Sequence, residues 1–313
     1  MSTIDTSPLG ADSTTVDITP ELLRKRRSQG RIIFDRFMRN RLAVGGAVVL
    51  LIMVLAAIFA PLLTHQTATY DPASKVDLAH LLEGPTAAHP LGTDDLGRDE
   101  FARLLEGARV SLLVGFASMF IGLVVGITIG AIAGFYGRWL DNVMMRITDA
   151  ILSVPLYLLL FVLSASFFSN GTITDVVILI AFFSWAPTAR IVRGEFLSIK
   201  EREYLYAART LGASDLRLMF MHALPNAIGP IIVAATLLIG NNIILESTLS
   251  FFGFGIQPPQ SSWGTMLATA QSYIFSDALL VFVPGLAILL TVLSFNLLGD
   301  GLRDALDPYM TER

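Results

Sequence analysis

The sequence contains no cysteine and few charged residues. Charged side chains make up 15% of the 313 residues, whereas an ordinary soluble domain carries about 25%. The absence of cysteine excludes a disulfide framework and any metal or redox centre built on thiolates. The four histidines show no H-x-x-x-H spacing, so we predict no metal site in the chain. Hydrophobic residues amount to 53%, which excludes a disordered chain and argues against a soluble enzyme.

Long apolar runs are present instead. A helix needs about 20 consecutive apolar residues to cross a bilayer. The first run begins at residue 42 and is too long for a cleaved signal peptide, so we predict a retained anchor. The sequence therefore predicts an all-α integral membrane protein with six transmembrane helices, the fourth resting on the shortest run. The runs are residues 42–64, 110–137, 150–174, 176–189, 223–245 and 278–299.

Basic residues set the predicted orientation. Eight lysines and arginines lie between Arg24 and Arg41, and a further group lies at 190–217. Because cytoplasmic loops carry the excess of Lys and Arg, we predict that both termini are cytoplasmic. The predicted segments are a cytoplasmic tail (1–41), an anchor helix (42–64), an external loop (65–107), a transmembrane domain (108–300) and a second cytoplasmic tail (301–313).

Glycines and prolines distinguish individual helices. The second run carries a ridge of small residues at four-residue intervals, which lets two helix backbones approach closely. We predict that this ridge packs within the chain, and a lining for a substrate path is the alternative. Pro155 and Pro187 are predicted to kink or end the third and fourth helices. The ridge consists of Gly122, Gly126, Gly130 and Gly134.

Polar residues inside the apolar runs are candidates for function. Glu246 lies near the outer end of the fifth run, close to Asn241 and Asn242. A carboxylate at membrane depth is costly and usually faces protein or water. We take these three residues as candidate pathway or gate residues, the alternative for Glu246 being contact with headgroups or a partner's arginine. Arg146 and Asp149 are predicted to form a local pair on one helix face.

The external loop holds acidic residues that could suggest calcium. The segment LGTDDLGRD contains Asp94, Asp95 and Asp99 with two glycines. Their spacing is not that of an EF-hand, whose ligands stand at positions 1, 3, 5 and 12. We predict a structured turn without a metal.

The internal stretch 194–222 is predicted to fold into two short helices. Ser198 and Glu201 have the spacing of a capping box that starts a helix. Gly212 suits the left-handed position after a helix end, and Ser214 can cap a second helix. Pro225 closes that helix or opens the fifth span. Short amphipathic helices on the cytoplasmic side predict a docking site for a soluble partner.

This stretch carries a family resemblance. YAARTLGASDLRLMFMHALPN resembles the signature E-A-A-x3-G-x9-I-x-L-P of bacterial ABC importer permeases. Tyr206 stands where the family has Glu, and His222 stands where it has Ile. The neighbouring Glu203 is a candidate to replace the missing carboxylate. Five positions match: Ala207, Ala208, Gly212, Leu224 and Pro225.

Other blocks narrow the resemblance to the C-type permease subunit of dipeptide/oligopeptide importers. The similarity runs from about residue 30 to residue 309 and includes several blocks in order. These blocks are HPLGTDDLGRDEFARLLEGARVSL, SWAPTARIVRGEFLSIKEREY, LESTLSFFGFGIQPPQSSWGTML and GDGLRDALDP. The resemblance implies the type I ABC importer permease architecture in the cell's inner (plasma) membrane.

The resemblance also implies partners. These are a homologous second permease subunit, two cytosolic ABC ATPase subunits and an external substrate-binding protein, beside membrane lipid. The formal net charge of −4 gives no indication of nucleic-acid binding. The chain has no G-x-x-x-x-G-K-[ST] loop, so we expect ATP and Mg²⁺ to bind only to the ATPase subunits. Coupling helices are expected at 198–223. The residues implied in ATPase coupling are Glu203, Tyr206, Ala207, Ala208, Gly212, Ala213, Asp215, Leu224 and Pro225.

At this point the substrate is undetermined, and two other classes of protein are alternatives to an importer permease. Permeases of this subfamily handle dipeptides and oligopeptides, and also nickel complexes, glutathione and oligosaccharides. A secondary transporter or channel would also have six helices, but seldom a folded docking segment of this kind. An intramembrane hydrolase would need a motif such as G-x-S-x-G or H-E-x-x-H, and neither occurs. We therefore expect a non-enzymatic subunit.

Overall fold

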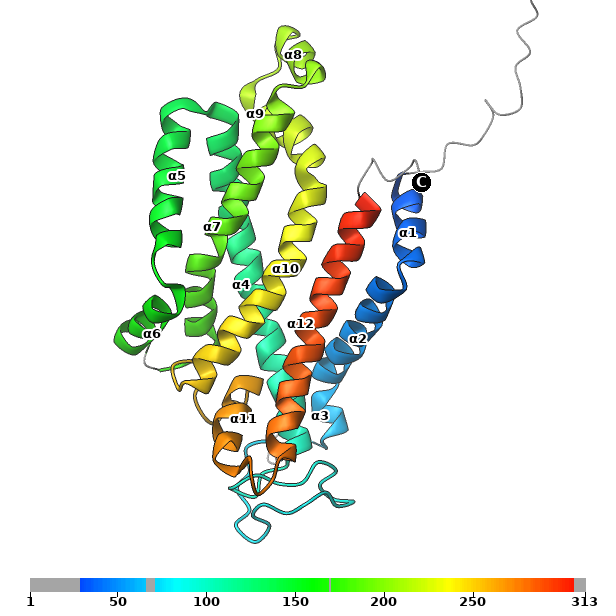
Figure 1. Ribbon diagram of the computed structural model, residues 1–313, viewed down its shortest axis with the longest axis vertical. Coiled ribbons are helices and arrows are strands. Elements are labelled where there is room, and N and C mark those ends of the chain that lie inside the picture. Colours follow the sequence, from blue (N-terminus) through cyan, green and yellow to red (C-terminus); the bar gives the residue numbers. More distant parts are fainter. Residues whose placement is uncertain (1–28, 66–70, 169, 307–313) are drawn as a thin grey trace, which may run out of the picture.

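The computed structural model describes residues 29–65, 71–168 and 170–306, and these residues form no named strand. Residues 1–28 of the predicted tail 1–41 and residues 307–313 of the predicted tail 301–313 lie outside the described residues. The helices form one elongated bundle, with α8 and α9 at one end and the non-helical segment 71–99 at the other (Figure 1). The longer helices are α1 (Gln29–Arg39), α2 (Arg41–Ile58), α4 (Glu100–Tyr136), α5 (Arg138–Ser153), α6 (Leu156–Phe167), α7 (Ile173–Lys200), α10 (Leu224–Phe251) and α12 (Leu279–Leu306). The shorter ones are α3 (Ala60–Leu63), α8 (Glu203–Thr210), α9 (Asp215–Arg217) and α11 (Trp263–Ala270).

The predicted spans correspond to helices of the bundle. Five described helices are long and apolar enough to cross a membrane, and a sixth span forms if the bent pair α5 and α6 counts as one. Two helices extend beyond the predicted bounds of their spans. The second span begins at Glu100, so residues 100–107 of the predicted external loop are helical, and α12 continues past residue 300 to Leu306.

The fourth span is a full-length helix, although the sequence gives it the shortest apolar run. In α7 67% of the most apolar 18-residue window is buried in the protein, against 22–33% in the other four helices. Neighbouring helices shield α7 from lipid, so polar residues are tolerated along it. Pro187 lies inside α7, which is helical on both sides of it.

The third span is broken at Pro155. The α5 and α6 helices meet at 85° across Val154 and Pro155. A proline pushes the preceding residue out of the α region, and Val154 is extended, with φ −82° and ψ 138°. The predicted effect of Pro155 is confirmed, and the break turns α6 away from the direction of α5 (Figure 1).

The small-residue ridge of α4 packs against α7. A Cβ built on Gly126 would come within 2.7 Å of Thr188 Cβ, and one on Gly134 within 2.7 Å of Phe196 Cβ. Gly122 faces Ser184 in the same way. Because these positions have no side chain, the two backbones approach closely over about three turns of helix. The four glycines therefore have the packing role predicted for them.

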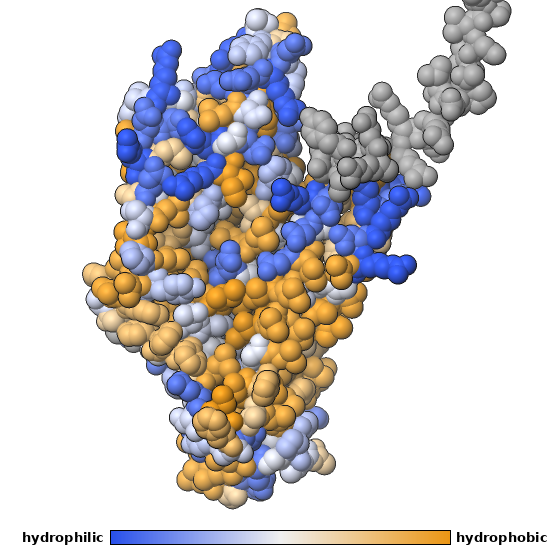
Figure 2. Space-filling model, viewed as in Figure 1, coloured by the Kyte–Doolittle hydropathy of each residue, from blue (hydrophilic) through white to orange (hydrophobic). Residues whose placement is uncertain are grey.

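The bundle presents an apolar middle and a buried core. Figure 2 shows apolar side chains over the middle of one face and hydrophilic ones gathered toward the end that carries α8 and α9.

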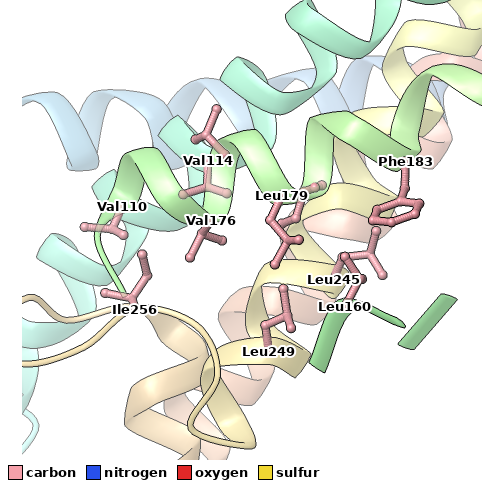
Figure 3. Packing of buried hydrophobic residues seen from close by; sticks show 11 residues of the cluster. Val110, Val114, Leu160, Val176, Leu179, Phe183, Leu245, Leu249 and Ile256 are labelled. Atoms are coloured by element: carbon pink, nitrogen blue, oxygen red, sulfur yellow. The ribbon is translucent and has the colours of Figure 1, made fainter. Parts of the chain in front are cut away.

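Val114 of α4, Leu160 of α6, Leu179 of α7 and Leu249 of α10 belong to one buried cluster (Figure 3). This cluster therefore packs the bent α6 against α4, α7 and α10.

Asp94 organises residues 71–99, the segment that the sequence predicts to be external. Its carboxylate accepts hydrogen bonds from the backbone N–H groups of Leu96 and Arg98, at 2.9 and 2.8 Å, and from the guanidinium groups of Arg98 and Arg103. His89 contacts Asp99 at 2.8 Å. No group of three or more potential metal ligands occurs within residues 29–65, 71–168 and 170–306. The predicted structured turn is confirmed, with arginines facing the acidic residues.

Candidate functional site

The coupling region predicted at 198–223 projects from one end of the bundle (Figure 1). It consists of α8, a turn, α9 and a π-helical turn at Leu218–Ala223 that leads into α10. The predicted capping box is wrong, because α7 continues through Lys200 and includes Ser198. The helix α8 begins after Arg202, whose side chain makes no capping hydrogen bond.

Two predicted helix boundaries in this region are confirmed, those at Gly212 and Pro225. Gly212 has a φ of +85°, and a Cβ built on it would meet nothing within 4 Å. Glycine is therefore needed there for its backbone conformation and not for space. Ser214 precedes α9 as predicted, although its side chain makes no capping hydrogen bond. Pro225 lies in the first turn of α10, so it opens the fifth span.

Buried contacts fix the coupling region to the ends of α4 and α7. Leu205 and Leu218 pack in a cluster with Phe135 and Phe196. Lys200 Nζ donates a 2.6 Å hydrogen bond to the Phe135 carbonyl oxygen. The turn between α8 and α9 is closed by Arg209 and Asp215, which form an ion pair of 3.0 Å, and the Arg209 guanidinium lies 5.7 Å from the Phe135 ring centre.

Several apolar side chains of this region are exposed among charged ones such as Glu203, Arg209 and Asp215. Leu211 is 88% exposed and Met221 is 72% exposed. Exposed apolar groups gathered on a polar extension indicate a surface for binding another protein. We call this surface the coupling face, and it consists of Tyr206, Leu211, Leu216, Phe220 and Met221.

The residues implied in coupling divide between that face and its support. Glu203, Ala207, Asp215 and Pro225 are exposed, as is Gly212. Ala208, Ala213 and Leu224 are half-buried against the cluster that holds the region in place. The small side chains of Ala207 and Gly212 leave the backbone of the turn accessible to a partner.

Glu246 is completely buried in a shell of serine hydroxyls. Ser250 donates to Oε1 at 2.7 Å, and Ser111 donates to Oε2 at 2.8 Å. Ser247 lies 3.4 Å from Oε2. A buried charge requires such partners, and here they join α4 to α10. The position excludes direct contact with headgroups in this structure, and the pathway or gate role stays a prediction.

Asn241 and Asn242 line a hollow that Glu246 does not reach. The hollow has a volume of about 310 Å³ and lies where α5, α6, α7 and α10 meet. Its walls are mostly apolar, and Ser184 and Tyr157 add hydroxyl groups. The sequence analysis missed Ser184 and Tyr157. The sequence carries a signal for both, because each is a polar side chain within a long apolar run.

Two ion pairs connect α5 to α7. Arg193 Nη2 donates to Asp141 at 2.7 Å, and Arg190 pairs with Asp149. The predicted local pair of Asp149 with Arg146 is replaced by this longer-range pair. Because α5 and α7 run antiparallel side by side, residues distant in sequence become neighbours.

Two family models match the chain. Residues 126–312 match the binding-protein-dependent transport system inner membrane component. Residues 28–85 match the N-terminal transmembrane domain of oligopeptide transport permease C. Together they cover the anchor helix, most of the bundle and the whole coupling region.

Individual relatives are similar over most of their length. The glutathione transport system permease protein GsiD of Pectobacterium atrosepticum is 42% identical over 282 residues, which cover 90% of this chain and 92% of the relative. The dipeptide transport system permease protein DppC of Alkalihalophilus pseudofirmus is 42% identical over 284 residues, 90% of this chain and 91% of the relative. The di/tripeptide transport system permease protein DppC of Pseudomonas aeruginosa is 44% identical over 280 residues, 88% and 90% of the two chains.

Proposed function

Since the chain belongs to the family of binding-protein-dependent transport system inner membrane components, we propose that it forms, with a homologous second permease, the path by which an ATP-driven importer moves dipeptides or oligopeptides. The chain is a multi-pass inner membrane protein and a permease subunit of an ABC importer. The peptide substrate is supported by the two DppC relatives. Glutathione is the second candidate, because GsiD is equally similar.

The coupling face carries the mechanical part of the proposal. Two cytosolic ATPases would bind ATP and Mg²⁺ and dock on this face and on its equivalent in the second permease. A push on Leu211 or Leu216 would pass through the cluster around Leu205 and Leu218 to α4, α7 and α10. An external binding protein would deliver the substrate at the opposite end. This chain would hydrolyse no ATP itself.

The orientation belongs to the same proposal. Both termini would be cytoplasmic, supported by the excess of Lys and Arg on that side. The chain has no cysteine, so single cysteines report topology directly. Ser214→Cys and Ala87→Cys lie at exposed positions near opposite ends of the bundle. In intact cells a membrane-impermeant maleimide should label Ala87→Cys alone, and the reverse pattern would invert the orientation.

The test of the proposed function is purification of the tagged chain in mild detergent, followed by mass spectrometry. A second permease and ATPase subunits should co-purify, and ATP-dependent uptake of a labelled dipeptide should depend on this chain. Excess glutathione would compete with the dipeptide only if both share the path. Recovery of the chain alone would contradict the proposal and favour a channel or secondary transporter.

A matched pair of glycine substitutions tests the coupling face. Gly212 and Gly253 have φ values of +85° and +80°, and a Cβ on either would meet nothing within 4 Å. Gly212→Asp should therefore strain the backbone as Gly253→Asp does, but it alone adds a charge beside the coupling face. We expect loss of ATPase association in Gly212→Asp and normal association in Gly253→Asp. Equal association in both variants would defeat the assignment.

A further inference from the structure

The hollow between α6, α7 and α10 has the composition of a small-molecule site. Its volume of about 310 Å³ is at the lower end of the range for ligand pockets, about 300–1,000 Å³. Phe183 and Leu245, which belong to the core in Figure 3, form part of an apolar wall. A few polar groups converge on this wall, as is typical of sites that orient a ligand.

In the Asn242 side-chain amide, Oδ1 has a hydrogen-bonding neighbour, and Nδ2 has none among the described residues. Asn242 has no exposed surface, and its Oδ1 lies 2.8 Å from Ser184 Oγ, a hydroxyl that lies equally close to the Ile180 carbonyl oxygen. Among the described residues, Nδ2 has no hydrogen-bond partner. Leaving a buried amide group unpaired costs about 1–3 kcal/mol. Nδ2 has no accessible surface in this structure, so a ligand carbonyl oxygen would remove this cost once a small movement of the wall admits it.

The rim of the hollow carries one charge of each sign. Leu152 of α5 and Pro187 of α7 line the hollow. Asp149 and Arg190 lie three residues from them on the same two helices, and the two charges form an ion pair. Their side chains are 53% and 50% exposed, so both remain accessible. Asp149 and Arg190 are not part of the lining itself, and a zwitterionic ligand that separates this pair would find a counter-ion for each of its ends.

From these features we propose that the hollow is a transient binding site for a dipeptide, in which Nδ2 of Asn242 hydrogen-bonds the peptide group. This inference rests on the proposed function. Ser184 is a positioning residue that orients the amide, and Asp149 and Arg190 receive the ammonium and carboxylate ends. An oligosaccharide would need more hydrogen-bonding groups than these apolar walls provide, and a nickel complex would find neither a thiol nor a histidine in the lining.

The experiment uses the complete complex in proteoliposomes, with the binding protein and a labelled dipeptide. Two quantities are measured: ATP hydrolysis stimulated by the loaded binding protein, and peptide transported per ATP hydrolysed. Asn242→Leu keeps the approximate volume and removes the amide. We expect it to lower transport per ATP about three- to tenfold, the value of one hydrogen bond, with stimulated hydrolysis unchanged. Ser184→Ala should have a smaller effect in the same direction.

The matched control is Asn296→Leu, the same change on α12 at an exposed position outside the hollow. It should leave both quantities unchanged. Wild-type transport per ATP in Asn242→Leu would overturn the inference. Failure of the wild-type complex to import the dipeptide would instead overturn the proposed function, and this is seen before any variant is compared.

A second measurement needs no variant and therefore does not depend on whether Asn242→Leu assembles. A dipeptide with a diazirine side chain is irradiated with the wild-type complex during turnover. Labelling of Tyr157 or Leu238, reduced by excess unlabelled dipeptide but not by a disaccharide, would support the site. Labelling confined to residues outside α5, α6, α7 and α10 would overturn it.

Discussion

Ser111 of α4 donates a 2.8 Å hydrogen bond to the carboxylate of Glu246 on α10, across 135 positions of sequence. The same hydroxyl accepts from the backbone N–H of Trp263, at the start of α11. A single serine thus links two membrane helices and the short helix at the end of the bundle opposite α8. Glu246 is the centre of this network because its two oxygens accept from serines of both α4 and α10.

Removal of the Glu246 carboxylate should destabilise the bundle. Glu246→Ala leaves the hydroxyls of Ser111 and Ser250 without their acceptor and opens a cavity. A buried hydroxyl left without its acceptor costs about 1–3 kcal/mol, so we expect a loss of about 3 kcal/mol. The check is the melting temperature of the purified protein, with unfolding monitored by tryptophan fluorescence. Glu246→Gln keeps an acceptor and should lose less; equal melting of Glu246→Ala and wild type would show that the network is not stabilising.

The contact between α4 and α7 should not tolerate a side chain at Gly130. A Cβ there would lie 2.5 Å from the Ala189 carbonyl oxygen, which cannot move without shifting α7. We expect Gly130→Leu to prevent normal folding, since overpacking costs about 1–3 kcal/mol even where neighbours can adjust. The yield of monodisperse protein on size exclusion measures this. Gly45→Leu, at a position with nothing within 4 Å, should give the wild-type yield, and a similar yield from Gly130→Leu would contradict the packing.

The folded structure of residues 71–99 should depend on Asp94 and not on its neighbour Asp95. Asp94→Ala leaves the guanidinium of Arg103, which is 3% exposed, without its main acceptor. Breaking one side of a buried ion pair costs about 3–5 kcal/mol. We expect faster proteolysis within 71–99. Asp95→Ala is the control, because no hydrogen-bond partner of Asp95 Oδ1 occurs among the described residues; equal cleavage of the two variants would contradict the role given to Asp94.

Acid should loosen the turn at Asp77. The pKa of Asp77 is lowered, first by the hydrogen bond from the Ala79 backbone N–H and then by the side chain of His80. A lowered pKa means that the stabilisation is present above the ordinary carboxyl value, about 3.9, and is lost as the pH falls through the folded value. Hydrogen exchange around Ala79 should therefore differ between wild type and Asp77→Asn at pH 6. The difference should disappear below the folded pKa, and a difference that persists there would exclude the carboxylate as its cause.

Charge reversal at Arg193 tests whether its ion pair with Asp141 holds α5 against α7. Arg193 pairs with Asp141, and these side chains are 33% and 14% exposed. Arg193→Asp places two carboxylates together and should lower both stability and transport. The double variant Arg193→Asp with Asp141→Arg should recover most of both, because the two positions remain adjacent. Absence of recovery would mean that one residue acts on something other than its partner.

The amino-acid sequence by itself determined the features that depend on short stretches of chain. Apolar length gave the membrane spans, Pro155 gave the break in the third, and Gly212 gave the left-handed turn of the coupling region. Each follows from the chemistry of a few adjacent residues: the missing N–H of proline, the missing Cβ of glycine, and the lack of water in the bilayer.

Only the tertiary structure decided which distant residues meet. It placed Ser198 inside α7, where the packed helix overrides a local capping pattern, and it paired Asp149 with Arg190 in place of Arg146. It buried Glu246 among serines. It also placed Asn242 beside a hollow, where its Nδ2 has no hydrogen-bond partner among the described residues. The physical reason is that burial and pairing depend on contacts between helices far apart in the sequence, and no local pattern specifies these contacts.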